Sequence, residues 1–316
     1  ESSDKIKEAM SGIKNLRKYP DPAATKLVEA IASYHGFNKE EVFVGVGSDD
    51  VLAVAFMTFF NGKKPIFFPD ITYSFYPVWA ELFGIPYEKK AVNDAFEIQK
   101  EDYYAENGGV VFPNPNAPTG AFLSLEVVED IIQHNQDVVV IVDEAYIDFG
   151  GDTAKELIRK YDNVLVVQTY SKSRSLAGLR IGYAIGNNEL IKAMNDVKYS
   201  YNSYTMNEPS IVLGTAVLED EEYFQETRNK IIDTREWFQI EMRKIGFSFA
   251  DSKANFIFAT HESVPAKEIF EAAKKAKIYV RYFDQPRINN YLRITIGTRE
   301  EMETLLDFLK EFTATK

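Results

Sequence analysis

The 316-residue sequence predicts an α/β protein with a large three-layer αβα domain, built on a mostly parallel sheet, and a smaller α+β domain. From Asn38 to Leu218, short apolar runs alternate with segments of helical periodicity, which is typical of a parallel sheet covered on both faces. Most of these runs lack polar alternation, as strands buried on both sides do. After Leu218, a long helix is followed by short strands mixed with helices, which indicates a second, smaller unit.

The elements of the large domain follow from the apolar runs and the helical periods between them. Strands are predicted, in order, at Val42–Val46, Pro65–Pro69, Pro86–Lys90, Val110–Phe112, Val138–Val142, Val164–Gln168 and Ile181–Ile185. Helices are predicted at Asp49–Phe60, Tyr73–Phe83 and Leu125–Asn135. We interpret both Val164–Gln168 and the run Arg180–Gly186 as buried parallel strands.

The small domain begins after a long predicted helix, Glu222–Lys244, which we expect to bridge the two parts. Strands are predicted at Phe247–Phe249, Asn255–Ala259, Ile278–Tyr282 and Leu292–Ile296, with a helix at Pro265–Lys275. The last helix carries apolar residues at helical spacing that we expect in the core: Met302, Leu305, Leu306, Leu309 and Phe312. We assign residues 30–245 to the large domain and residues 1–29 and 246–316 to the small one, with Lys5–Arg17 packing against the small domain.

Composition narrows the function classes. A net charge of −12 without a basic tract argues against nucleic-acid binding, which depends on phosphate contacts by Lys and Arg. The chain has no cysteine, which excludes thiol nucleophiles and disulfides and fits a reducing cytoplasm. Apolar runs such as Val51–Phe60 are shorter than the roughly 20 residues that span a bilayer, and the N-terminus shows no signal-peptide pattern. His35, His134 and His261 lack metal-ligand spacing, so we expect no metal and predict a cytoplasmic enzyme acting on small molecules.

Lys172 occupies the most informative position in the sequence. It lies in the loop between two predicted strands, at the sheet edge where open α/β sheets bind ligands. Its amine can condense with a carbonyl cofactor, while Ser171 and Arg180 offer a hydroxyl group and a guanidinium suited to a phosphate. A lysine beside a phosphate clamp suggests pyridoxal phosphate. A solvated lysine beside an ion-pairing arginine would give the same local pattern, so the interpretation needs further motifs.

Asp143 follows the apolar run Val138–Val142 directly, which delivers a carboxylate to the same sheet edge. A buried acid needs a cationic partner, and a protonated pyridine nitrogen would be one. Tyr146, three residues further on, is within reach of the ring hydroxyl of such a cofactor. Alternatively, Asp143 caps the following turn or binds Mg²⁺, although Walker-type glycine loops are absent.

Three weaker motifs also follow predicted strands. The stretch Gly45–Asp50 leads into a helix and suits a phosphate, or it is a plain turn capped by Ser48 or Asp49. Tyr73 either stacks on a planar ring or lies in the core. The asparagines of the rigid turn Asn114–Gly120 either donate to a ring oxygen or serve ordinary turn chemistry.

Together and in this order, the motifs resemble fold-type I pyridoxal-phosphate aminotransferases, and within them most closely the histidinol-phosphate aminotransferases. The resemblance covers nearly the whole chain. It rests on these stretches: Tyr19–Asp21, Gly47–Asp50, Thr72–Tyr73, Pro115–Gly120, Asp143–Tyr146, Ser171–Lys172, Ala177–Arg180 and Leu292–Thr298.

The resemblance implies a role for each matching residue. Lys172 would carry pyridoxal phosphate, Asp143 would hold the pyridine nitrogen, Tyr146 and Asn116 would contact the ring oxygen, and Tyr73 would stack on the ring. Ser48, Asp49, Ser171 and Arg180 would cradle the phosphate. Tyr19 would reach the phosphate of the neighbouring subunit's cofactor, which implies a homodimer with shared active sites. Arg293, Arg281 and Asn255 would receive the anionic end of the substrate.

The implied reaction transfers the amino group of histidinol phosphate to 2-oxoglutarate, giving imidazole acetol phosphate and glutamate in histidine biosynthesis. Alternatives are an aromatic amino acid aminotransferase, a threonine-phosphate decarboxylase-like lyase and a non-catalytic cofactor-binding regulator, which the fold does not separate. Two departures from the family pattern stand out. Ala117 replaces an asparagine that relatives often carry, and the N-terminal arm that closes over substrate is missing or reduced to residues 1–3.

Overall fold

The computed structural model describes residues 3–14 and 16–315. Over these residues, the large domain contains a seven-stranded sheet in the order β1-β7-β6-β5-β4-β2-β3. The strands are β1 (Val42–Gly45), β2 (Ile66–Pro69), β3 (Tyr87–Lys90), β4 (Val110–Pro113), β5 (Val140–Asp143), β6 (Val164–Thr169) and β7 (Gly182–Gly186). Pairing is parallel from β3 through β2, β4 and β5 to β6, which confirms the mostly parallel sheet.

The direction of β7 differs from our prediction. This strand is antiparallel to both β6 and β1, with Gly182 opposite Thr169 on one side and Gly45 on the other. A parallel neighbour requires a crossover that carries the chain back along the sheet. The connection of residues 170–181 contains only the short 3-10 helix η5 (Ala177–Leu179), so the chain returns directly beside β6.

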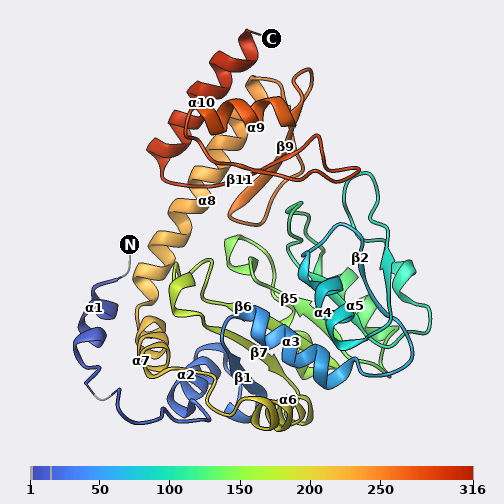
Figure 1. The fold of residues 1–316 in the computed structure, drawn as a ribbon, viewed down its shortest axis with the longest axis vertical. Helices are drawn as coiled ribbons and strands as arrows, with labels where there is room; N and C mark the ends of the chain where they lie inside the picture. Colours follow the sequence, from blue (N-terminus) through green and yellow to red (C-terminus); the bar gives the residue numbers. More distant parts are fainter. Residues whose placement is uncertain (1–2, 15, 316) are drawn as a thin grey trace.

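Helices cover both faces of this sheet, which confirms the three layers (Figure 1). One face packs against α3 (Ser48–Phe59), α4 (Phe75–Phe83) and α6 (Asn188–Tyr201), and the other against α2 (Thr25–His35), α5 (Leu125–Gln133) and α7 (Glu208–Ala216). In β5, Ile141 joins the first cluster while Val140 and Val142 join the second, because successive side chains of a strand point to opposite faces. This two-sided burial explains why the strands other than the edge strand β3 have continuous apolar sequences.

The remaining elements of the large domain are short 3-10 helices in its connections. They are η1 (Lys39–Glu41), η2 (Lys100–Tyr103), η3 (Ile147–Phe149), η4 (Ala154–Arg159) and η6 (Val217–Glu219). Of these, η3 follows the end of β5 and lies close to the functional residues described below.

The small domain stands on the long helix α8 (Glu221–Lys244), which rises from the large domain (Figure 1). Its antiparallel strands are ordered β10-β11-β9-β8 and comprise β8 (Phe247–Ser248), β9 (Phe256–His261), β10 (Arg281–Tyr282) and β11 (Leu292–Thr295). Its helices α9 (Ala266–Lys275) and α10 (Arg299–Ala314) pack on these strands. The core prediction for α10 is confirmed for Met302, Leu305, Leu306 and Leu309, with Phe312 partly buried against them.

The N-terminal helix α1 (Asp4–Ser11) lies elsewhere than we expected for Lys5–Arg17. Ile6 is buried in the core of the large domain, and α1 contacts α7. The Lys5 ammonium also donates to the Glu219 carbonyl, 2.5 Å away. Ile6 finds apolar surface on α7, and this contact places the helix beside the base of α8 (Figure 1). Asn15, within the same predicted segment, lies outside the described residues. The division at residues 29/30 and 245/246 stays a prediction.

Candidate active site

The predicted functional residues converge at the carboxyl edge of the large sheet. Asp143 ends β5, Lys172 follows β6 and Asn116 follows β4. Arg180 instead precedes β7, and because β7 runs in the opposite direction its amino end lies at the same edge. The antiparallel strand therefore returns the arginine to the side where the lysine lies, only eight residues after it in the sequence.

Asp143 is buried, and its carboxylate is held by two donors. The Tyr76 hydroxyl donates to Oδ2 over 2.9 Å, and the Ala145 amide donates to Oδ1 over 3.3 Å. Burial raises the pKa of Asp143 to about 6, against the opposing effect of these hydrogen bonds and of the Lys172 charge. Such a carboxylate is suited to a cation placed beside it.

Lys172 and Tyr146 face each other across the end of β5. The lysine nitrogen lies 5.2 Å from the centroid of the Tyr146 ring, and the side chain of Lys172 is half-buried. The Tyr146 ring in turn meets the edge of Phe256, a residue of β9, at 5.1 Å between centroids. The small domain, through Phe256, therefore contacts the Tyr146 ring that lies beside Lys172.

The turn between β1 and α3 forms a cup lined by a guanidinium. Gly47 has a φ of +88°, and a Cβ at this position would lie 2.5 Å from Nη2 of Arg180, so only glycine permits the approach. The same Nη2 lies 3.6 Å from Oδ2 of Asp49, whose Oδ1 accepts from the Tyr73 hydroxyl at 2.8 Å. Ser48 is the first residue of α3, where the amide groups of the helix end point outward.

Ser171 and Asn116 complete the edge. The Thr169 hydroxyl donates to Ser171 Oγ over 3.1 Å and accepts from the Ser171 amide over 3.2 Å, which fixes the serine beside the lysine. The buried amide nitrogen of Asn116 donates to the Ile71 carbonyl and to Thr119 Oγ1, both at 2.9 Å. Oδ1 of Asn116 is buried without a partner.

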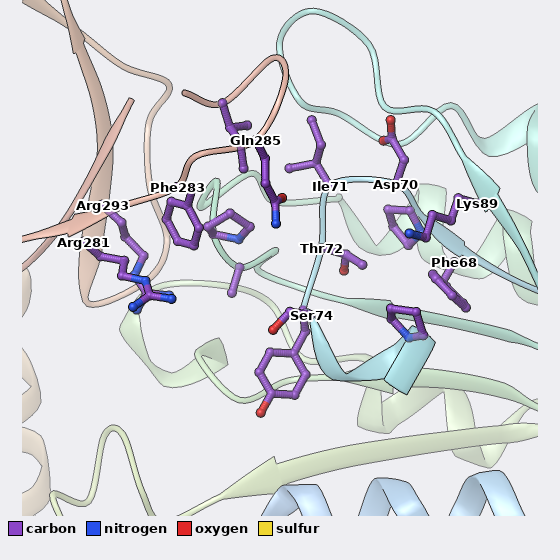
Figure 2. Close-up of a pocket in the computed structure, with 16 residues that line it drawn as sticks. Phe68, Asp70, Ile71, Thr72, Ser74, Lys89, Arg281, Phe283, Gln285 and Arg293 are labelled. Carbon is purple, nitrogen blue, oxygen red and sulfur yellow. The ribbon is translucent and has the colours of Figure 1, made fainter. Parts of the chain in front are cut away.

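A cavity of about 400 Å³ opens between this edge and the small domain (Figure 2). Its walls are Phe68–Ser74, Pro77, Lys89, Ala117 and Pro118 from the large domain, and Arg281, Phe283, Gln285, Ile288 and Arg293 from the small domain. The two guanidinium groups of Arg281 and Arg293 lie side by side in Figure 2, because these residues are opposite each other in the β10–β11 pair.

Arg293 carries an unused donor. Its guanidinium lies 5.2 Å from the Phe256 ring centroid and 5.8 Å from that of Phe283, and its buried Nε has no hydrogen-bond partner among the described residues. Arg281 lies 5.4 Å from the Phe283 centroid. An unpaired buried donor costs free energy, so the arginine pair is suited to bind an anion.

Asn255 and Tyr19 lie differently from the other predicted residues. Asn255 is absent from the lining of this cavity, and its backbone carbonyl accepts from the Ile296 amide over 2.8 Å. Tyr19 is 82% exposed, and its ring lies 4.7 Å from that of Tyr204 between centroids. Among the described residues, these interactions do not connect Asn255 or Tyr19 to the other predicted site residues.

Several residues that line the cavity or contact Asp143 were not predicted from the sequence, among them Tyr76, Phe283 and Gln285. Tyr76 holds Asp143, and its position three residues after Tyr73 on a predicted helix was a usable signal, since such residues share a helix face. Phe283 and Gln285 line the cavity from a loop that carried no motif. Within the described ranges, no group of three or more His, Asp or Glu side chains is arranged to hold a metal. Over the same residues, no helix is both long and apolar enough to cross a membrane.

Comparison with known proteins finds relatives along almost the whole chain. The histidinol-phosphate aminotransferase of Lactococcus lactis subsp. cremoris is 51% identical over 302 residues, which cover 96% of this chain and 85% of that protein. The histidinol-phosphate aminotransferase of Clostridium botulinum is 50% identical over 309 residues, covering 96% of this chain and 87% of that protein.

Solved structures share the fold. The histidinol-phosphate aminotransferase of Clostridium acetobutylicum superposes with a TM-score of 0.91 at 22% identity, covering 100% of this chain and 97% of that one. That of Sinorhizobium meliloti, in complex with pyridoxal-5'-phosphate, gives a TM-score of 0.89 at 21% identity, covering 99% and 88%. The model of the family Aminotransferase class I and II matches residues 2–309. With a lysine, an acid and a phosphate-type cup at one sheet edge, the chain belongs to the class I and II aminotransferases.

Proposed function

We propose that the protein transfers the amino group of histidinol phosphate to 2-oxoglutarate, giving imidazole acetol phosphate and glutamate. The observation that carries this proposal is the arginine pair in the cavity, with the buried Nε of Arg293 lacking a partner. Relatives about half identical over 96% of the chain, named histidinol-phosphate aminotransferases, support the same substrate.

As a class I and II aminotransferase, the protein uses pyridoxal phosphate, and its residues fit that group. Gly47 leaves room for the Arg180 guanidinium at the start of α3, where the helix end favours an anion. Ser48, Asp49, Ser171 and Arg180 would hold the phosphate. The buried Oδ1 of Asn116, which has no hydrogen-bond partner among the described residues, could accept a hydrogen bond from a protonated ring oxygen. When bound, the cofactor supplies an aldehyde and an electron-withdrawing ring.

The protein's own groups then divide the work. Lys172 would hold the cofactor through its amine, and the same amine, when free, is placed to take a proton from the substrate's α-carbon. Asp143, whose carboxylate is oriented by Tyr76, would hold the proton of the cofactor's ring nitrogen, and a cation beside it would lower its raised pKa. Tyr146 and Asn116 would contact the ring oxygen, and Tyr73 would stack on the ring.

Arg281 and Arg293 would bind the anionic end of each substrate in turn. One substrate ends in a phosphate and the other in a carboxylate, and a guanidinium accepts either through forked hydrogen bonds. The Nε of Arg293 offers one such donor. We assign Asn255 to the same substrate contact, although its carbonyl serves the strand pairing.

The active form would be a homodimer in the cytoplasm. Tyr19 is largely exposed, so its hydroxyl is free to reach the cofactor phosphate of a neighbouring subunit. The absence of cysteine fits a reducing compartment.

Steady-state kinetics with histidinol phosphate, phenylalanine and threonine phosphate test the proposal. Histidinol phosphate should have the highest kcat/KM. Arg293→Ala should lower kcat/KM for both histidinol phosphate and 2-oxoglutarate by roughly 30- to 1,000-fold, since a lost charge-assisted contact costs about 2 to 4 kcal/mol. Arg293→Lys should recover part of the loss. A higher kcat/KM for phenylalanine would assign the enzyme to aromatic amino acids, CO₂ release from threonine phosphate would assign it to the lyases, and cofactor binding without turnover would indicate a regulator.

A further inference from the structure

We infer that Arg287 is a positioning residue that ties the two walls of the substrate cavity together and so sets its width, an inference that rests on the proposed function. Arg287 lies in the small domain, in the loop between β10 and β11. Its Nη1 donates to Oδ2 of Asp70 over 2.9 Å. Its Nη2 donates to the carbonyls of Val92 and Asn93 over 2.6 and 3.1 Å. One side chain thus joins the small domain to two loops of the large domain.

Asp70 makes this tie part of the cavity. It follows β2 and lines the cavity together with Ile71 and Thr72 (Figure 2). Its second oxygen, Oδ1, accepts from the Val92 amide over 3.0 Å. Asp70 and Arg287 therefore both bind the backbone of the segment after β3. The loop that Arg287 contacts through Asp70 is the same loop that lines the cavity from the large domain.

The neighbours of Arg287 are seated in the large domain as well. Ile288 is 2% exposed and belongs to the large-domain core cluster. Arg287 itself has a φ of +69°, a conformation that costs an arginine energy and persists only when its contacts hold it. Tyr291 stacks on Phe258 at 4.7 Å and meets the edge of Phe96, from the large domain, at 5.2 Å between centroids.

A second tie between the domains lies along α8. Arg235 is buried, and its Nη1 donates to the Phe149 carbonyl over 2.9 Å and to the Ala254 carbonyl over 2.8 Å. Phe149 belongs to the large domain and Ala254 immediately precedes Asn255 of the small one. Arg235 joins the two domains next to α8. On the opposite side, where the cavity lies, the contacts of Arg287 therefore set the distance between the two domains.

The consequence for the reaction is a fixed spacing between the substrate-facing residues. Phe283 and Gln285 line the cavity from the same small-domain loop as Arg287, and the loop that begins at Asp70 lines it from the large domain. Releasing the tie would leave both walls intact but would populate wider cavities, which weakens apparent binding in proportion to the competent fraction lost. A molecule that is already bound would react at nearly the same rate, so the expected effect falls on KM.

The test compares Arg287→Gln with the wild-type holoenzyme. Deuterium uptake over residues 283–291 should rise, and KM for histidinol phosphate should rise about 5- to 10-fold with kcat nearly unchanged, since the ion pair is partly exposed. Arg287→Lys should restore part of the KM. Arg159→Gln is the matched control, because Arg159 also donates to a backbone carbonyl, that of Gly36 at 2.8 Å, but within the large domain. It should change neither quantity.

Asp70→Asn supplies an independent second variant, since it removes the charge and leaves an acceptor for the Val92 amide. It should raise KM in the same direction, and its effect should not add to that of Arg287→Gln, because both remove one interaction. The wild-type KM should rise with salt more than that of the variants, since the paired side chains are 37% and 28% exposed.

Unchanged deuterium uptake in Arg287→Gln would overturn the tie itself. Raised uptake with an unchanged KM would overturn its role in setting the cavity. If the wild-type enzyme does not transaminate histidinol phosphate, the proposed function fails instead, and the deuterium uptake still decides whether Arg287 joins the walls.

Discussion

Two adjacent carboxyl groups at the end of β5 have opposite surroundings. Asp143 faces Tyr76 and the lysine side, whereas Glu144 points to the other side of the sheet. Glu144 accepts from the Thr153 hydroxyl and the Ala154 amide at 2.6 Å each, and from the Gln168 amide at 2.7 Å. Burial raises the pKa of Glu144 to about 7. The free energy of unfolding should therefore depend on pH through this residue, which has no proposed role in catalysis.

We expect the apoprotein to lose stability as the pH rises towards 7 because of Glu144. Its folded pKa of about 7 lies above the usual glutamate pKa of 4.5, so folding binds a proton that is released as the pH rises. The stabilisation is therefore present below about pH 4.5 and lost by about pH 7, with a size on the order of 2 to 4 kcal/mol. Urea denaturation of wild type and Glu144→Gln from pH 5 to 8 should show a flatter dependence in the variant. Parallel curves would assign the slope to other groups.

A second prediction at the residue scale concerns Lys172. Borohydride treatment of the holoenzyme should attach the cofactor permanently to this side chain, because only the lysine that holds the aldehyde forms a reducible bond. Peptide mass mapping locates the label, and a label on another lysine would remove Lys172 from its role. Lys172→Ala should retain cofactor through the phosphate cup but lose turnover.

The sequence predicted that Lys172 and Asp143 lie at the edge of the sheet, because each comes shortly after an apolar run that is typical of a buried strand. The sequence did not single out Tyr76. Its spacing from Tyr73 places the two residues on one helix face, but it does not show whether the Tyr76 hydroxyl reaches solvent or a carboxylate. The ion pair between Arg287 and Asp70 was also not predictable from the sequence, because the two residues are far apart in the chain and meet only once the domains are in place.

At the scale of the element, the turn from β1 to α3 depends on Gly47. Gly47→Ala should push Arg180 away, since the new Cβ would lie 2.5 Å from its Nη2, and the holoenzyme should lose cofactor faster. Absorbance after gel filtration measures the retained cofactor, and circular dichroism should show an intact fold. Gly84→Ala is the control, because Gly84 also has a positive φ, +68°, but nothing lies within 4 Å of its added Cβ. Equal cofactor loss in both variants would mean that backbone strain, and not Arg180, is responsible.

Elements differ in how far their sequence determines them. Most strands of the large sheet were predicted because burial on both faces leaves an apolar run, whereas the edge strand β3 is partly exposed and carries charged residues. The direction of β7 was not predicted correctly, since an apolar sequence does not show whether a strand is parallel or antiparallel to its neighbours. The place of α1 was missed for a related reason: its amphipathic pattern shows that one face is buried, but not which surface of the protein covers it.

At the scale of the whole molecule, we expect a dimer that completes the cofactor site. Tyr19→Phe should weaken cofactor retention without unfolding the subunit, because only the hydroxyl that reaches the neighbour's phosphate is removed. Sedimentation of the wild-type holoenzyme should give the mass of two chains. A fully active monomer would contradict this arrangement.

The position of β7 has a consequence for how the protein is made. In the described sheet, β1 pairs only with β7, and β7 is the last strand of that sheet along the chain. Because the ribosome delivers the N-terminus first, Val42–Gly45 emerges as an apolar strand whose sheet partner has yet to be translated. The nascent chain must keep this strand from pairing with other molecules until Gly182–Gly186 follows. The Gly47 turn and Arg180 thus meet only when translation of the large sheet is complete.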